Sequence, residues 1–160
     1  MVRVQVQEGP IDFHGEQDSL WQRNPRIGAV VTFVGLMRDM NAGEDVQALT
    51  LEHYPGMTER ALGAIAEEAA RRWDLQGLTI VHRVGILAPQ DAIVLVGVAS
   101  SHRREAFQAC EFLIDYLKTR APFWKKELTQ SGERWVEARD EDQEAAVRWI
   151  HDSQDRRPSR

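Results

Sequence analysis

Lys118, Lys125 and Lys126 are the only lysines among twenty basic residues in this chain, and all three fall within nine consecutive positions. Arginine supplies a permanent cation, whereas a lysine amine can lose its proton when it is desolvated and then act as a base or nucleophile. The clustering therefore indicates either amine chemistry or a solvated basic end of a helix. The residue types alone leave these two interpretations equally open.

A second cationic group, residues 101–104 (Ser-His-Arg-Arg), begins a predicted helix directly after a buried strand. The free amides at a helix start, together with the side chains of His102 and Arg103, suit a phosphate or carboxylate. On one continuous helix, sixteen residues would separate His102 from Lys118 by about 24 Å. A site shared by both therefore predicts a symmetric dimer, in which one subunit supplies His102 and Arg103 and the other supplies Lys118 and Lys125.

Lys118 lies near the end of this helix, one turn beyond Ile114 on its apolar stripe. Its amine is either partly desolvated or placed to complement the negative end of the helix dipole. Pro122 ends the helix. Phe123 and Trp124 fit either simple packing anchors or an aromatic cluster that directs the neighbouring cations into a pocket.

The charge of the chain narrows the class of ligand. A formal net charge of -5 disfavours nucleic acid and anionic membranes as partners. Between His102 and Lys126, six Arg or Lys oppose three Asp or Glu, which gives a local net charge of +3. This contrast favours a small anionic ligand. The N-terminal residues contain no signal-peptide apolar stretch, so we expect a cytoplasmic protein.

The sequence gives little support for a bound metal ion or cofactor. Cys110 is the only cysteine, which excludes an internal disulfide or a CxxC motif, and its place on an apolar helix face predicts a buried thiol. The histidines show no HxxxH or HxH spacing, and His53 and His82 fall on strand faces, where core or rim positions are common. There is no P-loop, GxGxxG or GxSxG. We therefore expect no metal and no cofactor, and sulfur chemistry would need sulfur from elsewhere.

The elements that must position these residues follow from hydrophobic periodicity. Alternating or continuous apolar runs predict strands, whereas apolar residues at three- and four-residue spacing predict helices, including a stripe that contains Phe107 and Cys110. Predicted strands cover 2–6, 28–35, 46–54, 78–84, 93–99 and 135–138; predicted helices cover 18–23, 57–73, 102–119 and 141–151, with loops at 36–45 and 85–91.

These elements predict an α+β fold with helices packed on a mixed, largely antiparallel sheet. The length of 160 residues fits one domain, which we place at residues 1–151. Residues 152–160 are polar, and we expect them to form a disordered tail.

Several blocks follow one another along the chain: Gly28–Gly35 with Arg38, Leu49–Met57, His82–Gly85, Val96–Arg103, Asp115–Glu127 and Trp135–Ala138. Together, in this order, they resemble the large, catalytic subunit of molybdopterin synthase. The resemblance runs from about Val2 to Trp149, nearly the whole chain.

The resemblance implies an α/β-hammerhead fold and a sulfurtransferase of molybdenum cofactor biosynthesis. Such an enzyme puts two sulfurs into cyclic pyranopterin monophosphate and forms the dithiolene of molybdopterin. A small ubiquitin-like subunit brings the sulfur as a C-terminal glycine thiocarboxylate. Two large subunits form the homodimer at the centre of a heterotetramer.

The resemblance also implies roles for individual residues. Lys118 and Lys125 match the essential lysines of the family, which lie beside the thiocarboxylate tail and the pterin. Our hypothesis is that Lys118 orients and activates the thiocarboxylate carbonyl, with transient covalent attachment as one route, and that Lys125 assists as acid or base. The family often carries a polar residue soon after the strand glycine, where this chain has Leu36, so only backbone contacts are expected there. The implied substrate-binding residues are Leu36, Met37, Arg38, His102, Arg103, Lys118, Lys125, Lys126 and Glu127.

Without the resemblance, the residues do not choose among this activity and two others. One is a Schiff-base lyase in which Lys118 attacks a carbonyl group of a different substrate. The other is a non-catalytic adaptor whose basic groove receives the acidic tail of another protein.

Overall fold

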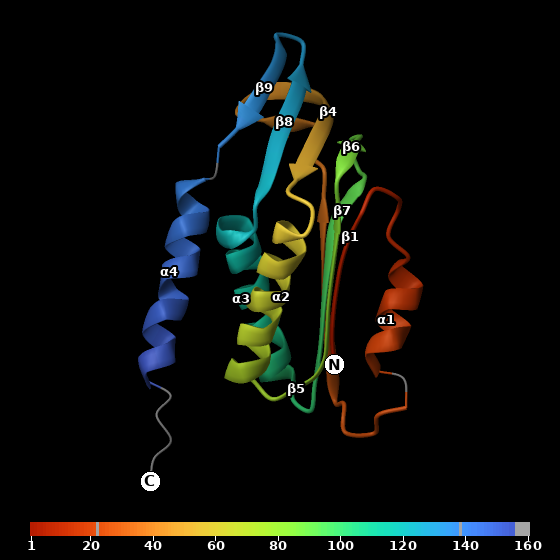
Figure 1. Ribbon diagram of the computed structural model, residues 1–160, viewed down its shortest axis with the longest axis vertical. Helices are drawn as coiled ribbons and strands as arrows, with labels where there is room; N and C mark the ends of the chain where they lie inside the picture. The colour runs from red at the N-terminus through yellow and green to blue at the C-terminus, as the bar shows by residue number, and fades with distance from the viewer. Residues whose placement is uncertain (22, 138, 156–160) are drawn as a thin grey trace.

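The computed structural model describes residues 1–21, 23–137 and 139–155, which form four helices and nine strands (Figure 1). In chain order, the elements are β1 (Val2–Gln7), α1 (Phe13–Trp21), β2 (Ala29–Leu36), β3 (Met40–Asn41), β4 (Glu44–His53), α2 (Met57–Arg72), β5 (Leu75–Arg83), β6 (Gly85–Leu87), β7 (Ala92–Ser100), α3 (Arg103–Arg120), β8 (Phe123–Thr129), β9 (Gly132–Val136) and α4 (Asp140–Asp155).

The first sheet has the strand order β1-β5-β7-β2, in which β1 and β5 are parallel and the other pairs are antiparallel. Helices α2 and α3 cover one face, α4 packs on the far side of α3, and α1 covers the opposite face (Figure 1). The larger core lies between α2, α3 and the sheet, where Val96, Phe112 and Leu113 have no exposed surface. This architecture confirms the predicted α+β fold.

The second sheet has the order β3-β4-β8-β9, with β6 paired to β4. It lies beyond the C-terminal end of α3, because only Ala121 and Pro122 separate that helix from β8 (Figure 1). A smaller core that contains Met37, Leu49 and Leu87 holds it together. The chain passes from one sheet to the other after β2 and after β5, so several segments meet at the junction.

Helix α1 differs from its prediction, since it begins at Phe13 rather than Asp18. The Asp12 side chain accepts a hydrogen bond from the Gly15 amide (3.1 Å), and the Asp12 carbonyl accepts one from the Glu16 amide (3.0 Å). Such contacts are typical of a helix N-cap. The glycine in the first turn conceals this helix start in the sequence.

Helix α3 was predicted closely, but Phe107 does not belong to its buried stripe. Phe107 is 61% exposed, whereas Ala106, Ala109 and Leu113 are fully buried. A helix advances by about 100° per residue, so Phe107 is rotated away from the face that packs on the sheet.

Both predicted loops contain short strands, and one further strand lies where none was predicted. Strand β3 and the start of β4 lie within predicted loop 36–45, and a tight turn at Ala42 and Gly43, both with positive φ (52° and 78°), joins them. Strand β6 lies within 85–91. Strand β8 begins at Phe123, directly after the proline at which the preceding helix was predicted to stop. Strand β9 covers Gly132–Val136, whereas the predicted strand was 135–138. Residue 138 lies outside the described residues.

The C-terminal helix α4 extends to Asp155 rather than His151. No glycine or proline interrupts the sequence between Asp140 and Asp155, so no helix breaker requires an earlier end. The predicted tail is therefore helical at residues 152–155, and residues 156–160 lie outside the described part of the chain. Among the described helices, none combines the length and apolar character needed to cross a membrane.

Candidate functional site

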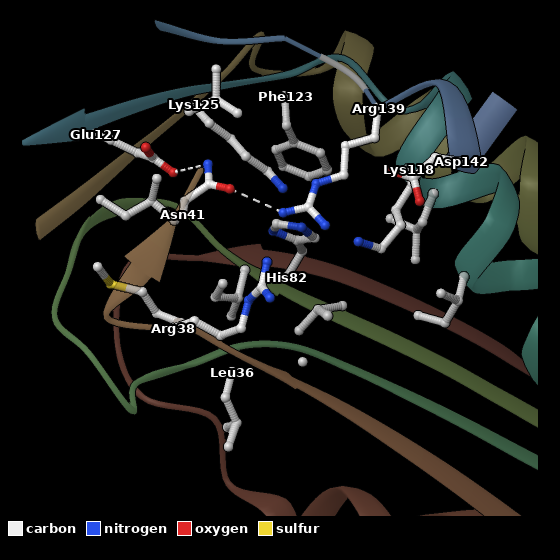
Figure 2. Close-up of a pocket in the computed structure, with 18 of the residues that line it drawn as sticks. Leu36, Arg38, Asn41, His82, Lys118, Phe123, Lys125, Glu127, Arg139 and Asp142 are labelled. Carbon is white, nitrogen blue, oxygen red and sulfur yellow. Dashed lines mark hydrogen bonds between the residues drawn. The ribbon is translucent and has the colours of Figure 1, made fainter. Parts of the chain in front are cut away.

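A pocket opens at the junction of the two sheets, and cationic side chains from distant parts of the sequence line it (Figure 2). Arg38 follows β2, Lys118 lies in the last turn of α3, Lys125 lies on β8 and Arg139 precedes α4. This concentration of positive charge within an acidic chain suits a small anionic ligand.

Helix α3 and strand β8 together bring Lys118 and Lys125 to the same pocket. Pro122 lacks a backbone donor and prevents the helix from continuing, and β8 then pairs antiparallel with β4. Alternate residues of a strand face opposite sides, so Phe123, Lys125 and Glu127 face the pocket. Lys118 is exposed, whereas Lys125 is half-buried.

Lys125 is the lysine whose titration is clearly perturbed. Burial lowers the pKa of its amine below the usual 10.5, and the positive charge of Lys118 lowers it further; the acidic Asp142 and Glu127 act in the opposite direction. A lowered pKa increases the fraction of neutral amine near physiological pH. The pocket therefore contains an amine suited to proton transfer.

Glu127 supports the pocket wall rather than offering a free carboxylate to a ligand. It is 6% exposed, and its two oxygens accept hydrogen bonds from Asn41 Nδ2 (2.7 Å) and Arg134 Nε (3.0 Å). Asn41 Oδ1 in turn accepts a hydrogen bond from Arg139 Nη2 (3.1 Å; Figure 2). This network holds Arg139 at the pocket edge, a role that the sequence does not indicate.

Lys126, predicted as a substrate-binding residue, faces the other side of β8 and does not line the pocket. Its Nζ lies 3.5 Å from a carboxylate oxygen of Glu133 and 5.4 Å from the centre of the Trp135 ring. Lys126 thus belongs to the outer face of the second sheet.

Residues 36–38 all line the pocket, but in different ways. Leu36 is 56% exposed, whereas Met37 is buried in the small core. The Met37 amide donates to the Asp91 carbonyl (2.8 Å), and its carbonyl accepts from the Gln90 amide (2.9 Å). The Met37 backbone is therefore already engaged, and Arg38 supplies the charged group.

His102 and Arg103 lie at the opposite end of α3 from Lys118 and do not line the pocket. Both are exposed, and α3 is continuous from Arg103 to Arg120. The rise of about 1.5 Å per residue keeps the two ends of the helix far apart. One chain therefore does not bring all the predicted site residues together.

His82 and Phe123 form an aromatic pair in the pocket wall, with ring centroids 3.8 Å apart and an interplanar angle of 16°. The sequence places His82 correctly on a strand face, but its contact with Phe123 joins residues from different sheets. Local periodicity contains no signal for such a contact.

Cys110 is buried, as predicted, and burial raises the pKa of its thiol to about 12. A thiol that stays protonated is a poor nucleophile. Within the described residues, no group of three or more His, Cys, Asp or Glu side chains is arranged to hold a metal ion.

Comparisons with known proteins match most of the chain. Residues 6–120 match the family described as MoaE protein. The molybdopterin synthase catalytic subunit of Pseudomonas aeruginosa is 58% identical over 146 residues, which cover 91% of this chain and 97% of that protein. The similarity therefore includes the segments that carry Arg38, Lys118 and Lys125.

Solved structures share the fold. The molybdopterin biosynthesis MoaE protein from Burkholderia ambifaria MC40-6 has a TM-score of 0.81 at 53% identity, over 94% of this chain and 99% of that chain. A chain in the protein–protein complex of subunits 1 and 2 of molybdopterin-converting factor from Helicobacter pylori 26695 shows the same fold at 20% identity. Its TM-score is 0.67, over 85% of this chain and 91% of that chain.

Proposed function

Because this chain belongs to the MoaE family, we propose that it is the catalytic subunit of molybdopterin synthase and transfers sulfur to cyclic pyranopterin monophosphate. The sulfur comes from the C-terminal thiocarboxylate of a small ubiquitin-like subunit, and the product is the dithiolene of molybdopterin. The observation that carries this proposal is the meeting of Lys118, Lys125, Arg38 and Arg139 in one pocket. A cyclic phosphate and a thiocarboxylate are both small anions, which such a pocket attracts.

The positions of the two lysines support different roles. Lys118 is exposed, where an incoming tail can reach it, and it orients and activates the thiocarboxylate carbonyl. Lys125 is half-buried with a lowered pKa, and it gives or takes a proton during sulfur transfer. Arg38 and Arg139 stabilise the negative charge that develops.

A homodimer would complete this site. Strand β2 is an edge of the first sheet, and it exposes Phe33 and Val34, while the neighbouring α3 exposes Phe107. A contact between two copies over these apolar side chains, with a two-fold axis across α3, would bring His102 and Arg103 of one copy toward the pocket of the other. The predicted anion-binding pair and the lysines would then share one substrate.

The test is to mix the purified chain with a thiocarboxylated small subunit and cyclic pyranopterin monophosphate, and to assay for the dithiolene product. We expect product from the natural chain and a strong loss with Lys118→Arg, which keeps the charge but removes a readily titratable amine. Absence of product from the natural chain would refute the function. A normal rate with Lys118→Arg would refute only the role of the amine.

A further inference from the structure

His82 has one ring nitrogen engaged and one open to the pocket. Its Nδ1 lies 2.8 Å from the Arg83 carbonyl oxygen, and its ring stacks on Phe123. Among the described residues, its Nε2 has no hydrogen-bond partner. Figure 2 shows the imidazole near the centre of the labelled pocket side chains.

The hydrogen bond to Arg83 sets the tautomer of His82. A carbonyl oxygen only accepts hydrogen bonds, so Nδ1 carries the proton. In the neutral ring, Nε2 then presents a lone pair and acts as an acceptor. Burial keeps the ring neutral by lowering its pKa to about 4, and the charges of Lys125 on β8 and His53 on β4 act in the same direction, against the effect of the Arg83 carbonyl.

Acceptors are scarce among the other polar groups of the pocket. Arg38 and Arg139 carry only donors, and so do Lys118 and Lys125 in their charged forms. The Glu127 oxygens and Asn41 Oδ1 already accept hydrogen bonds within the protein. The carboxylates of Glu137 and Asp142 also line the pocket, but both are charged acceptors, and Asp142 acts on the Lys125 amine. The Nε2 atom of His82 is an uncharged acceptor in the wall of the pocket. The cations can hold the anionic part of a ligand, but they cannot satisfy its N–H or O–H groups.

We propose that His82 is a specificity-determining residue, whose Nε2 accepts a hydrogen bond from an N–H or O–H group of the uncharged part of the pterin. This inference rests on the proposed function, because it takes the pterin as the ligand. The cations fix the phosphate, and His82 fixes the orientation of the ring system relative to Lys125. A ligand that carries an acceptor at the same place meets a lone pair and is disfavoured.

The direct test is nitrogen NMR of the natural chain labelled with ¹⁵N-histidine, titrated with cyclic pyranopterin monophosphate alone. We expect the Nε2 resonance of His82 to move toward the position of a hydrogen-bonded nitrogen, while that of His14, exposed on α1, stays unchanged. The spectrum of His82→Phe assigns the signal. Binding of the pterin without a change at His82 overturns the inference and leaves the proposed function intact; no binding of the pterin and no turnover overturn both.

Matched variants separate an acceptor from a packing residue. His82→Phe keeps an aromatic ring against Phe123 but removes the acceptor, whereas His82→Gln offers an amide oxygen near the same place. We expect His82→Phe to raise the pterin KM about 10- to 100-fold, because a buried donor on the substrate loses its partner, and to lower kcat by a smaller factor, because the ring system is less well oriented toward Lys125. His82→Gln should recover part of that loss. An unchanged KM in His82→Phe, or a fall in kcat alone, contradicts the inference. If His82→Phe does not fold, the NMR titration of the natural chain decides the question, and the spectrum of His82→Gln then assigns the His82 signal.

Discussion

The two faces of β8 give neighbouring lysines opposite surroundings. Lys125 faces the pocket, where burial and the charge of Lys118 lower the pKa of its amine. Lys126 faces outward, where Glu133 and the Trp135 ring are its neighbours. A shift of one residue along the strand separates an amine suited to proton transfer from an ordinary surface cation.

The acidic residues repeat this contrast. Glu127, on the pocket face, is 6% exposed and accepts hydrogen bonds from Asn41 and Arg134. The side chain of Glu133, on the outer face, is 62% exposed and lies near Lys126. The carboxylate on the pocket face is therefore held by specific protein partners, whereas the carboxylate on the outer face is largely solvated.

The largest expected difference between the faces is in catalysis. Lys125→Met removes the proposed proton-transfer group, so we expect kcat/KM for dithiolene formation to fall by about 10²- to 10⁴-fold. Lys126→Met should change it by only about twofold, since a solvated ion pair contributes little. Steady-state kinetics of the two variants measure this, and equal losses would contradict the assignment of faces.

A second expected difference separates His82, in the pocket wall, from the exposed His14: only His82 should make the stability of the fold depend on pH. The folded-state pKa of His82 is about 4 against 6.5 for an ordinary histidine, so the unfolded chain binds more protons between these values. The neutral His82 therefore costs no stability above pH 6.5, and the free energy of unfolding falls as the pH drops from 6.5 toward 4. The total loss at and below pH 4 is about 3 kcal/mol.

Urea unfolding of the natural chain and of His82→Phe between pH 3 and 7 measures this contribution. We expect the stability of His82→Phe to fall less steeply below pH 6.5, whereas His14→Phe, altered at an exposed histidine, should follow the natural chain. Parallel curves for all three proteins would show that His82 is not held neutral by burial.

A smaller effect, on the free energy of unfolding, is expected when Glu127 on the pocket face and Glu133 on the outer face lose their charges. Glu127→Gln keeps the shape of the side chain but removes the charge that Arg134 meets, and we expect a loss of about 2 kcal/mol in the free energy of unfolding. Glu133→Gln should change it by less than about 0.5 kcal/mol, because its side chain is solvated. Denaturant midpoints at one pH compare the two, and a larger effect at Glu133 would reverse the proposed contrast.

The smallest expected effect is on the titration of Lys125. Lys118→Met removes a positive charge that lowers the pKa of Lys125, so this pKa should rise toward 10.5. With only three lysines in the chain, ¹³C-lysine NMR can follow each amine through a pH titration. No change at Lys125 would mean that the two amines do not interact in solution.

The sequence predicts those parts of the fold that follow local patterns. Helices α2 and α3 and strands β5 and β7 were placed to within a few residues, because their apolar periodicity reflects burial against one core. Strand β8 was missed, because Lys125 and Glu127 occupy its inward positions, where a strand pattern has apolar residues. The polar positions that hide this strand from prediction are those that line the pocket.

The sequence predicted some of the residues of the candidate site but not those whose positions depend on contacts between distant segments. Residue types and the family resemblance indicated Lys118, Lys125 and Arg38, which the structure brings together. Arg139 and His82 were not predicted as site residues, because their places depend on contacts with Asn41 and Phe123 that are distant in sequence. Because strand β8 was not predicted, the sequence indicated no face for its residues, and Lys126 was predicted as a substrate-binding residue beside Lys125. The pairing of β8 with β4 places the Lys126 side chain on the outer face.

The most direct measurement is zero-length cross-linking of the chain to the small subunit that ends in an ordinary carboxylate, followed by peptide mapping. A carbodiimide joins a carboxyl group to an adjacent amine, and the three lysines make the site of attachment unambiguous. We predict that the C-terminal carboxylate of the small subunit is joined to Lys118 or Lys125, and that free cyclic pyranopterin monophosphate reduces the yield. Attachment of that carboxylate at Lys126 alone, or at no lysine, would contradict a sulfur-transfer pocket at the junction of the two sheets.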